Sequence, residues 1–259
     1  MSQARKSQEV WTAISAEWEK PEEAAKVEFI QYYKPFFYAM EEFMPKEKGM
    51  KVLEAGCGTA THTAYMAHEW GARGICLDFV PEMMKLAKEK FLAAGVEGDF
   101  VVGDMRRLPF KDGAFNMVFN QGTIEHFPKH ERQVILDEMC RVSGKYVAIF
   151  VPNMLNPIRA VAKRVQKLTG RWIWGLELPF SQFELERRLK RAGMTVTKKA
   201  GVNFYKIYYT YWPFRLFLYP ALRRILGERI FRMNAGDDLL NTYFGDEIFQ
   251  LAVKNGKAG

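Results

Sequence analysis

The sequence contains few cysteines and no hydrophobic run of membrane-spanning length. Its three cysteines, Cys57, Cys76 and Cys140, form no Cys-X-X-Cys pair, which favours thiols packed as small apolar groups in a reducing compartment. No stretch approaches the roughly 18 consecutive apolar residues of a transmembrane helix. The first ten residues are polar, so no secretory signal is expected. A cytoplasmic protein is predicted, with the inner face of a membrane as a further place of peripheral contact.

Acidic residues are scarce in one late section of the chain. Between residues 156 and 233 there are 17 Lys and Arg but only 4 Asp and Glu, a net charge of +13, whereas the whole chain carries +8. Such a basic region attracts phosphates, anionic membranes or acidic substrates. A solvated basic surface that serves only solubility explains the same charge, and the sequence leaves both interpretations open.

From Met50 onward, short apolar runs alternate with amphipathic stretches. The apolar runs predict seven strands, at residues 51–55, 74–79, 99–102, 115–120, 146–151, 195–201 and 247–253. The amphipathic stretches predict helices at residues 59–70, 81–94, 129–142 and 183–192. Strands that alternate with helices indicate βαβ units with right-handed crossovers, and therefore an α/β fold built on a parallel sheet.

Four regions are predicted around this alternation. Residues 1–49 read as an N-terminal helical cap made of two helices. Residues 50–259 form the main domain, which two insertions interrupt at about residues 153–180 and 203–245. Connections of that length usually carry function or structure of their own.

A glycine turn follows the first predicted strand. Gly56 and Gly58 lie between the end of that strand and the next helix. Glycine lets the backbone turn sharply and approach a ligand closely, and the start of the helix adds unpaired N–H groups and a positive dipole end. The glycine pattern of dinucleotide-binding folds has a third glycine three residues after the second. Thr61 occupies that position, which argues against an NAD-linked oxidoreductase.

Carboxylates follow the next two strands. Asp78 ends the second strand 22 residues after Gly56, where it accepts hydrogen bonds from two ribose hydroxyls or caps the helix that begins near Pro81. Asp104 ends the third strand at the same edge of the sheet. Ligands of open α/β sheets bind outside these carboxyl ends, so the sequence predicts a nucleotide-type ligand there.

The order and spacing of these segments resemble the class I S-adenosylmethionine-dependent methyltransferases, and most of all the small-molecule branch that includes the ubiquinone and menaquinone methyltransferases. The resemblance rests on the glycine turn, the two aspartates, the Leu-Pro-Phe run at residues 108–110 and the polar turn that follows the fourth strand. It covers residues 50–152 well, and the later strands in topology only. It implies a Rossmann-like, doubly wound sheet of seven strands, the last one antiparallel, and S-adenosylmethionine as the cofactor.

The same resemblance implies which residues bind the cofactor. The glycine turn would line its methionine part, the second strand would hold its ribose and adenine, the third would read the adenine edge, and the fourth would lie near the methionine amino group or the sulfonium. The residues concerned are Glu54, Gly56, Cys57, Gly58, Asp78, Phe79, Asp104, Met105, Asn120 and Gln121. Asn116 departs from the family, which usually has Asp at that position.

Glu125 and His126 follow the fourth strand and raise the question of a proton acceptor. His126 is the candidate catalytic base, because the pKa of histidine shifts readily across neutral pH. It is equally suited to be a residue at the start of a helix, with the hydrogen bonds of its ring satisfied by the backbone. Some relatives bind a divalent metal here, but Gly122 stands where a second carboxylate would be expected, so no metal is predicted. Trp11 and Trp18 suit a lid over the site, or ordinary packing.

An aromatic segment lies within the basic section. Nine of the 17 residues from 203 to 219 are aromatic, and Lys206 and Arg215 lie among them. Aromatic residues with flanking cations suit a membrane interface. The segment builds a pocket and lid for a bulky or lipid-like acceptor, adds to the core, or binds RNA. No recognised RNA-binding module is present, so nucleic acid is not the expected partner.

The sequence as a whole predicts methyl transfer from S-adenosylmethionine to a small, hydrophobic or lipid-like acceptor. The sulfonium is already a strong methyl donor, so catalysis needs positioning and exclusion of water more than covalent chemistry. Two alternatives stay open: an RNA or protein methyltransferase that uses the basic section, and a non-catalytic S-adenosylmethionine-binding protein.

Overall fold

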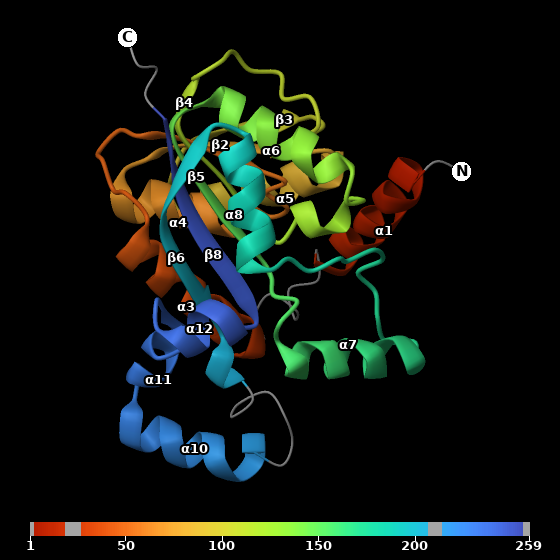
Figure 1. The fold of residues 1–259 in the computed structure, drawn as a ribbon, viewed down its shortest axis with the longest axis vertical. Coiled ribbons are helices and arrows are strands. Elements are labelled where there is room, and N and C mark those ends of the chain that lie inside the picture. The colour runs from red at the N-terminus through yellow and green to blue at the C-terminus, as the bar shows by residue number, and fades with distance from the viewer. Residues whose placement is uncertain (1–2, 19–26, 207–213, 256–259) are drawn as a thin grey trace.

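A sheet of eight strands forms the centre of the computed structural model, which describes residues 3–18, 27–206 and 214–255 (Figure 1). The strand order is β3-β2-β1-β4-β5-β8-β6-β7. The first five strands run parallel, β8 lies antiparallel between β5 and β6, and β7 pairs antiparallel with β6. The strands are β1 Lys51–Ala55, β2 Arg73–Asp78, β3 Gly98–Val102, β4 Phe115–Gln121, β5 Ser143–Pro152, β6 Met194–Val202, β7 Ala235–Gly236 and β8 Glu247–Lys254.

This arrangement confirms the predicted α/β, Rossmann-like sheet, including the antiparallel strand near the C-terminus. The predicted number of strands was one too low. The additional strand, β7, has only two residues and lies inside the second insertion, where it adds to the edge of β6. A two-residue strand has no periodicity of its own, so only its pairing identifies it.

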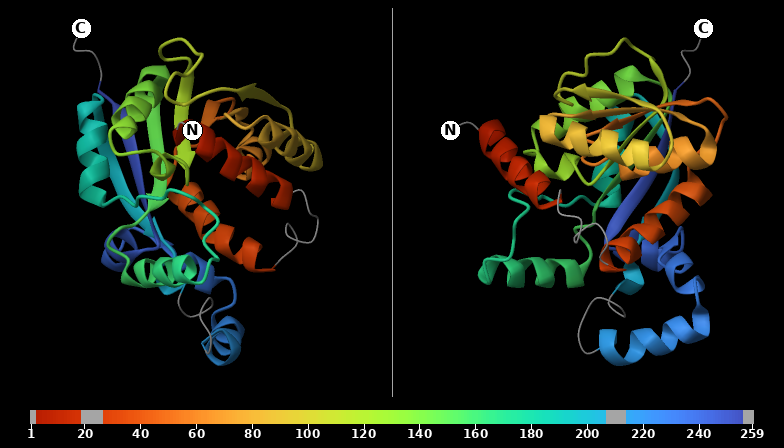
Figure 2. Two further views of the ribbon diagram at one scale, coloured as in Figure 1. Left: turned by 90° about the vertical axis from the view of Figure 1, so that its right-hand side faces the viewer. Right: turned by 180° about the vertical axis from the view of Figure 1, so that it is seen from behind.

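Helices cover both faces of the sheet, because alternate residues of each strand point to opposite sides. On one face, α6 (Glu131–Val142) and α8 (Gln182–Arg191) pack against a cluster that includes Leu53 and Ile149. On the other face, α3 (Val27–Phe43), α4 (Thr61–Trp70) and α5 (Pro81–Ala93) cover neighbouring strand residues such as Val52 and Phe150. The result is a three-layer α/β/α arrangement (Figure 2).

The two N-terminal helices occupy different places. The second, α3, packs directly on the sheet, with Phe36, Met40 and Phe43 buried against β5 and β8. The first, α1 (Gln3–Trp18), contacts α5 through Ile14 and reaches the carboxyl edge of the sheet through Trp11. The side chain of Trp18 lies outside the described residues, so only Trp11 is placed for the predicted lid.

The two insertions carry helices of their own. Residues 153–180 contain α7 (Pro157–Leu168). The second insertion contains η2, α10, α11 and α12 in addition to β7: Phe204–Lys206, Phe214–Leu226, Arg229–Arg232 and Leu239–Phe244. Both α7 and α10 stand away from the sheet at the same end of the molecule (Figures 1 and 2). Residues 207–213 of the aromatic segment lie outside the described residues. No helix in the described ranges is long and apolar enough to span a membrane.

The packing of the second insertion against β6 leaves no room for a side chain at Gly201. A Cβ atom there would lie 1.9 Å from the carbonyl oxygen of Asn241 in α12. We expect Gly201→Ala to lower the free energy of unfolding by about 3 kcal/mol, because neither backbone yields easily. Urea denaturation measures the loss. Gly103→Ala is the control, since the nearest atom there is the movable Cδ1 of Leu77 at 3.0 Å. Equal stability of the two variants would contradict the close packing.

Candidate cofactor and acceptor site

The glycine turn lies across the carboxyl ends of β1 and β2. Gly56 and Gly58 adopt positive φ angles of 73° and 51°, which L-residues with side chains rarely adopt. The N–H groups of Gly56 and Cys57 both donate to the carbonyl oxygen of Leu77, at 2.7 and 3.0 Å. The Gly58 N–H donates to Oδ2 of Asp78 at 3.0 Å. The turn is therefore attached to the end of β2 at several points.

Asp78 holds this turn from a buried position. Its Oδ1 accepts from the Val80 N–H at 3.0 Å, while its Oδ2 accepts from Gly58. Burial raises the pKa of Asp78, although the backbone hydrogen bonds act in the opposite direction. Each carboxylate oxygen accepts more than one hydrogen bond. The predicted capping and ribose-binding roles are thus compatible, because the capping hydrogen bonds leave acceptor positions for hydroxyl donors.

Glu54 and Cys57 are buried beside the same turn. Oε2 of Glu54 accepts from the N–H and the hydroxyl of Thr63, and His62 Nδ1 lies 3.7 Å from its Oε1. The carboxylate therefore accepts from an N–H group in the first turn of α4, where a negative charge is favourable. Burial raises the pKa of the Cys57 thiol well above its usual value, so this cysteine packs as a neutral group. Phe79 is half-buried and packs against the apolar cluster that contains Cys57.

Asp104 lies just beyond β3 rather than in the strand, which ends at Val102. Its carboxylate is half exposed and bonded to Arg106, whose Nη2 lies 2.6 Å from Oδ2. Partial burial opposes ionisation, but the hydrogen bonds and charge of Arg106 outweigh it and lower the pKa of Asp104. Met105 is buried in the core. Sequence reasoning overlooked Arg106, although an arginine two residues after an aspartate is a local signal for such a pair.

Asn120 and Thr123 connect β4 to the glycine turn. The buried Asn120 amide donates to the carbonyl oxygen of Ala55 at 2.5 Å, and its Oδ1 accepts from the Ile124 N–H at 3.3 Å. The hydroxyl of Thr123 donates to the carbonyl oxygen of Gly56 at 2.8 Å. Asn120 therefore joins the ends of β1 and β4. Thr123 was not among the predicted site residues, because its contact joins segments 67 positions apart.

His126 lies in the short helix η1 (Ile124–His126) and is held by the backbone. Its Nδ1 lies 2.5 Å from the carbonyl oxygen of Leu176, so Nδ1 carries the proton and donates. The ring packs edge-on against Trp11, with ring centroids 4.9 Å apart. Burial lowers the pKa of His126 to about 4, so the imidazole is neutral at physiological pH. The structure favours the helix-start interpretation, while the predicted catalytic role stays a prediction.

Glu125 is the buried carboxyl group of this region. Its side chain is 2% exposed, and its Oε2 has no hydrogen-bond partner among the residues that the structure describes. Burial raises the pKa of Glu125 well above its usual value, and the charges of Glu247 and Glu177 add to the effect. Gln121 lies beside Glu247, with its Nε2 3.5 Å from Oε2 of that residue. Acidic groups from η1, β8 and the first insertion therefore gather at this edge. Among the described residues, no cluster of histidine, cysteine or acidic side chains is arranged to hold a metal.

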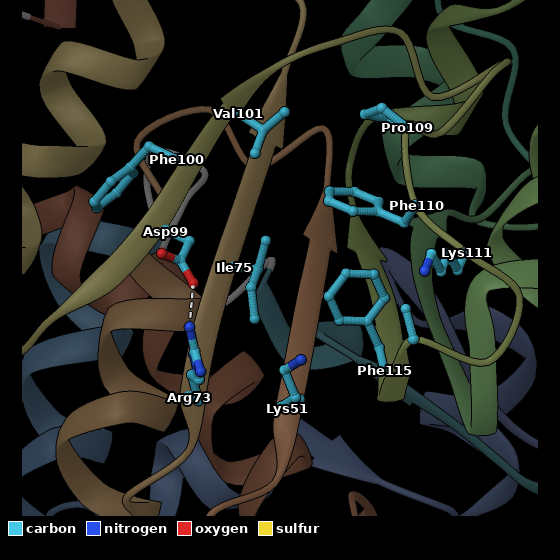
Figure 3. Close-up of a pocket in the computed structure, with 11 residues that line it drawn as sticks. Lys51, Arg73, Ile75, Asp99, Phe100, Val101, Pro109, Phe110, Lys111 and Phe115 are labelled. Atoms are coloured by element: carbon cyan, nitrogen blue, oxygen red, sulfur yellow. Dashed lines mark hydrogen bonds and ion pairs between the residues drawn. The ribbon is translucent and has the colours of Figure 1, made fainter.

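A separate groove of about 580 Å³ lies on the sheet near the amino ends of the strands (Figure 3). Lys51, Arg73 and Phe115, which begin β1, β2 and β4, line it together with Val101 and Phe110. The groove stays open because the chain passes from β3 to β4 without a helix to cover this part of the face. It does not include the glycine turn.

Comparison with known proteins bears directly on this edge of the sheet. Residues 52–145, which contain the glycine turn, both aspartates and η1, match the family described as Methyltransferase domain. These residues are similar to the methyltransferase domain family. This match confirms the predicted resemblance for the part of the chain that forms β1 to β4 and α6.

Curated relatives match about two fifths of the chain. The chain is 30% identical over 109 residues to ajmaline N-methyltransferase of Rauvolfia serpentina, covering 41% of this chain and 37% of that protein. It is 34% identical over 104 residues to demethylmenaquinone methyltransferase of Listeria monocytogenes, covering 39% of this chain and 43% of that protein. The match thus spans about two fifths of the length of these relatives.

Solved structures extend the likeness to the whole fold. A chain from the complex between the Haloferax volcanii Trm112 methyltransferase activator and a methyltransferase superposes with a TM-score of 0.67 at 19% identity, covering 98% of this chain and 99% of that chain. Magnesium protoporphyrin IX methyltransferase from Synechocystis, solved with bound SAH, gives 0.57 at 16% identity over 87% of this chain and 83% of that chain. The family match over residues 52–145 and the fold of these structures agree with the predicted resemblance.

Proposed function

We propose that this chain transfers a methyl group from S-adenosylmethionine to a small, hydrophobic or lipid-like acceptor. The observation that carries the proposal is the hydrogen bond from Gly58 to Asp78, which holds the glycine turn at the carboxyl edge of the methyltransferase domain. The curated relatives are named for small molecules, among them ajmaline, demethylmenaquinone and tocopherol. A cytoplasmic location belongs to the proposal, because all three cysteines are free and buried.

The residues at this edge fit the cofactor. When bound, S-adenosylmethionine supplies an electrophilic methyl group on its sulfonium. The glycine turn lets the backbone approach the ligand, and Asp78 offers acceptors to the ribose hydroxyls. Trp11 lies against His126 and, with ring centroids 6.0 Å apart, against Trp174. These rings close one side of the edge and exclude water, which favours displacement at a methyl group.

Glu125 is the residue we propose as the proton acceptor for a hydroxyl or amine acceptor. With the cofactor bound, Oε2 of Glu125 would take the proton that the acceptor atom loses when it receives the methyl group. Once ionised, a carboxylate with a raised pKa is a stronger base than an ordinary one, so methyl transfer should speed up as the pH rises through the raised pKa of Glu125. His126, whose pKa is lowered to about 4, is a weak base by comparison. Its Nδ1 already donates to the carbonyl oxygen of Leu176.

Three other functions remain to be separated from this one. An RNA or protein methyltransferase would use the basic section, a non-catalytic protein would bind the cofactor without turnover, and an oxidoreductase would bind NAD. Isothermal titration with S-adenosylmethionine, its demethylated product and NAD distinguishes the last from the others. A screen with quinones, phenols, lipids and transfer RNA, read by formation of the demethylated product, distinguishes the rest.

Asp78→Asn tests the cofactor site itself. The amide keeps one acceptor oxygen but removes the negative charge, so we expect the Kd for S-adenosylmethionine to rise about tenfold, the value of one charge-assisted hydrogen bond. Titration calorimetry measures this change. Asp99→Asn, on the neighbouring strand and paired with Arg73 at 3.1 Å, is the control and should bind as the unaltered protein does. An unchanged Kd for Asp78→Asn would remove Asp78 from the site.

A further inference from the structure

The helix α7 packs with its polar side toward the protein. Arg159 and Lys163 form ion pairs with Glu177 at 2.9 and 3.0 Å, and Lys163 also lies over the ring of Trp172. These contacts attach α7 to the rest of the protein through the basic side of the helix. A surface helix of a globular protein normally does the opposite and packs its apolar side inward.

The apolar side of α7 consequently faces outward. Val161, Val165 and Leu168 recur at helical spacing, and their exposed fractions are 61%, 52% and 88%. No residue of α7 between its ends is buried. Met154, which precedes the helix, and Ile173, which follows it, are each 54% exposed. A contiguous apolar patch on a soluble surface indicates contact with another apolar phase.

Positive charge surrounds this patch. The helix contains no acidic residue, and Arg164, Lys167 and Arg171 beside the apolar stripe are exposed. The occupant of this surface is therefore negatively charged as well as apolar. An anionic lipid surface combines these properties, because it offers acyl chains to the aliphatic residues and phosphates to the cations. A nucleic acid offers phosphates but no aliphatic phase.

The position of α7 adds a second helix to the same surface. The helix α10 lies at the same end of the molecule (Figures 1 and 2). Its described C-terminal half exposes Ile225, which is 78% exposed, together with Arg223 and Arg224. Residues 156–233, which contain both helices, carry the charge of +13. The parts of the basic section that form α7 and α10 thus lie at one end of the molecule, while its α8 and β6 belong to the sheet and its covering layer.

We propose that α7 docks on an anionic membrane surface. Val161, Val165 and Leu168 enter the acyl boundary, while Arg164, Lys167 and Arg171 contact lipid phosphates. The helix begins five residues after β5 ends, and Glu177, its partner, lies near Glu125. Docking through α7 therefore brings the proposed acceptor side of the sheet to the membrane. This orientation of the acceptor side rests on the proposed function, whereas the docking itself does not.

Co-sedimentation with vesicles tests the docking. Vesicles of phosphatidylcholine with phosphatidylglycerol should pellet the full chain, whereas vesicles of phosphatidylcholine alone should pellet much less. We expect Val161→Glu combined with Leu168→Glu to raise the lipid concentration for half-maximal binding by at least about tenfold, since each buried aliphatic side chain contributes on the order of 1.5 kcal/mol. Arg164→Gln with Lys167→Gln should remove most of the preference for anionic lipid.

Leu92→Glu is the matched control, because Leu92 is 81% exposed at the end of α5. This variant should bind vesicles as the unaltered protein does. Calorimetric binding of S-adenosylmethionine should be the same in all variants, which separates failure of docking from failure of the proposed function. The proposal is overturned if the unaltered chain stays in the supernatant or if the α7 variant pellets equally. It is also overturned if size-exclusion chromatography shows a dimer that only the α7 variant dissociates, because a second copy then covers the patch.

Discussion

Substituting alanine for Gly56 should weaken the binding of S-adenosylmethionine by about a thousandfold, because two independent penalties of roughly 1–3 kcal/mol each add. The first penalty is conformational, since Gly56 has a φ of 73°. The second is steric, since a Cβ atom at this position would lie 2.5 Å from Cγ2 of Thr123 and 2.8 Å from its Oγ1. Both penalties displace the turn that Asp78 holds for the ligand.

A second substitution separates the two penalties. Thr123→Ala removes these two atoms but keeps Cβ of residue 123, 2.9 Å from the added carbon. The double variant Gly56→Ala with Thr123→Ala should therefore recover part of the affinity and retain the conformational penalty and the contact with this Cβ. Calorimetry measures the Kd, and circular dichroism establishes that each variant is folded. Gly95→Ala is a suitable control, because Gly95 also has a positive φ but no atom lies within 4 Å of its added carbon. Binding by Gly56→Ala within threefold of the unaltered protein would mean that the turn does not contact the cofactor.

Replacing Glu125 by glutamine should lower the rate of methyl transfer by about 10²- to 10⁴-fold, the usual contribution of a general base. The Kd for S-adenosylmethionine should not change, because the proposed role begins with the acceptor. His126→Ala should keep more of its activity, since the pKa of His126 is already lowered to about 4. Single-turnover kinetics with an acceptor found in the screen measure both variants. A larger loss in His126→Ala would reverse the two assignments.

Glu125 also has a pH signature that needs no acceptor. Its pKa is raised in the folded protein, so the folded state holds this proton when the unfolded state has lost it, and stability falls as pH rises from the ordinary Glu pKa of about 4.3 through the raised value. Glu125→Gln lacks this loss, so its Tm relative to that of the unaltered protein should increase as the pH rises above the ordinary Glu pKa. Glu186→Gln is the matched control. Lys199 and Lys190 lower the pKa of Glu186, so its removal should not give this gain.

Much of the architecture was predictable from local sequence patterns. The period of the apolar residues identified all seven longer strands within a few positions, and the glycines and Asp78 marked the ligand edge. These features are local because strand alternation, positive φ and a carboxylate at a strand end each involve only neighbouring residues. The extent of β5 was underestimated, since Ser143 joins the sheet only through its pairing with Phe115.

The finer features of the site were decided by contacts between distant segments. Asn120 was predicted to lie near the cofactor, yet its buried amide joins Ala55 and Ile124. Asp104 was predicted to read an adenine edge, and its carboxylate is bonded to Arg106. A side chain's partner depends on which elements meet in space, and residue type alone does not specify that.

By itself, the sequence determined an α/β sheet with a glycine turn and an aspartate at its ligand edge, because short-range periodicity and backbone conformation are encoded residue by residue. Only the tertiary structure decided that Glu125 is buried without a partner for one oxygen, and that α7 turns its apolar side outward. Burial and orientation are set by what the rest of the chain places around a side chain. Glu177, which holds the basic side of α7, shows how one distant contact reverses the orientation that hydrophobic periodicity alone would predict.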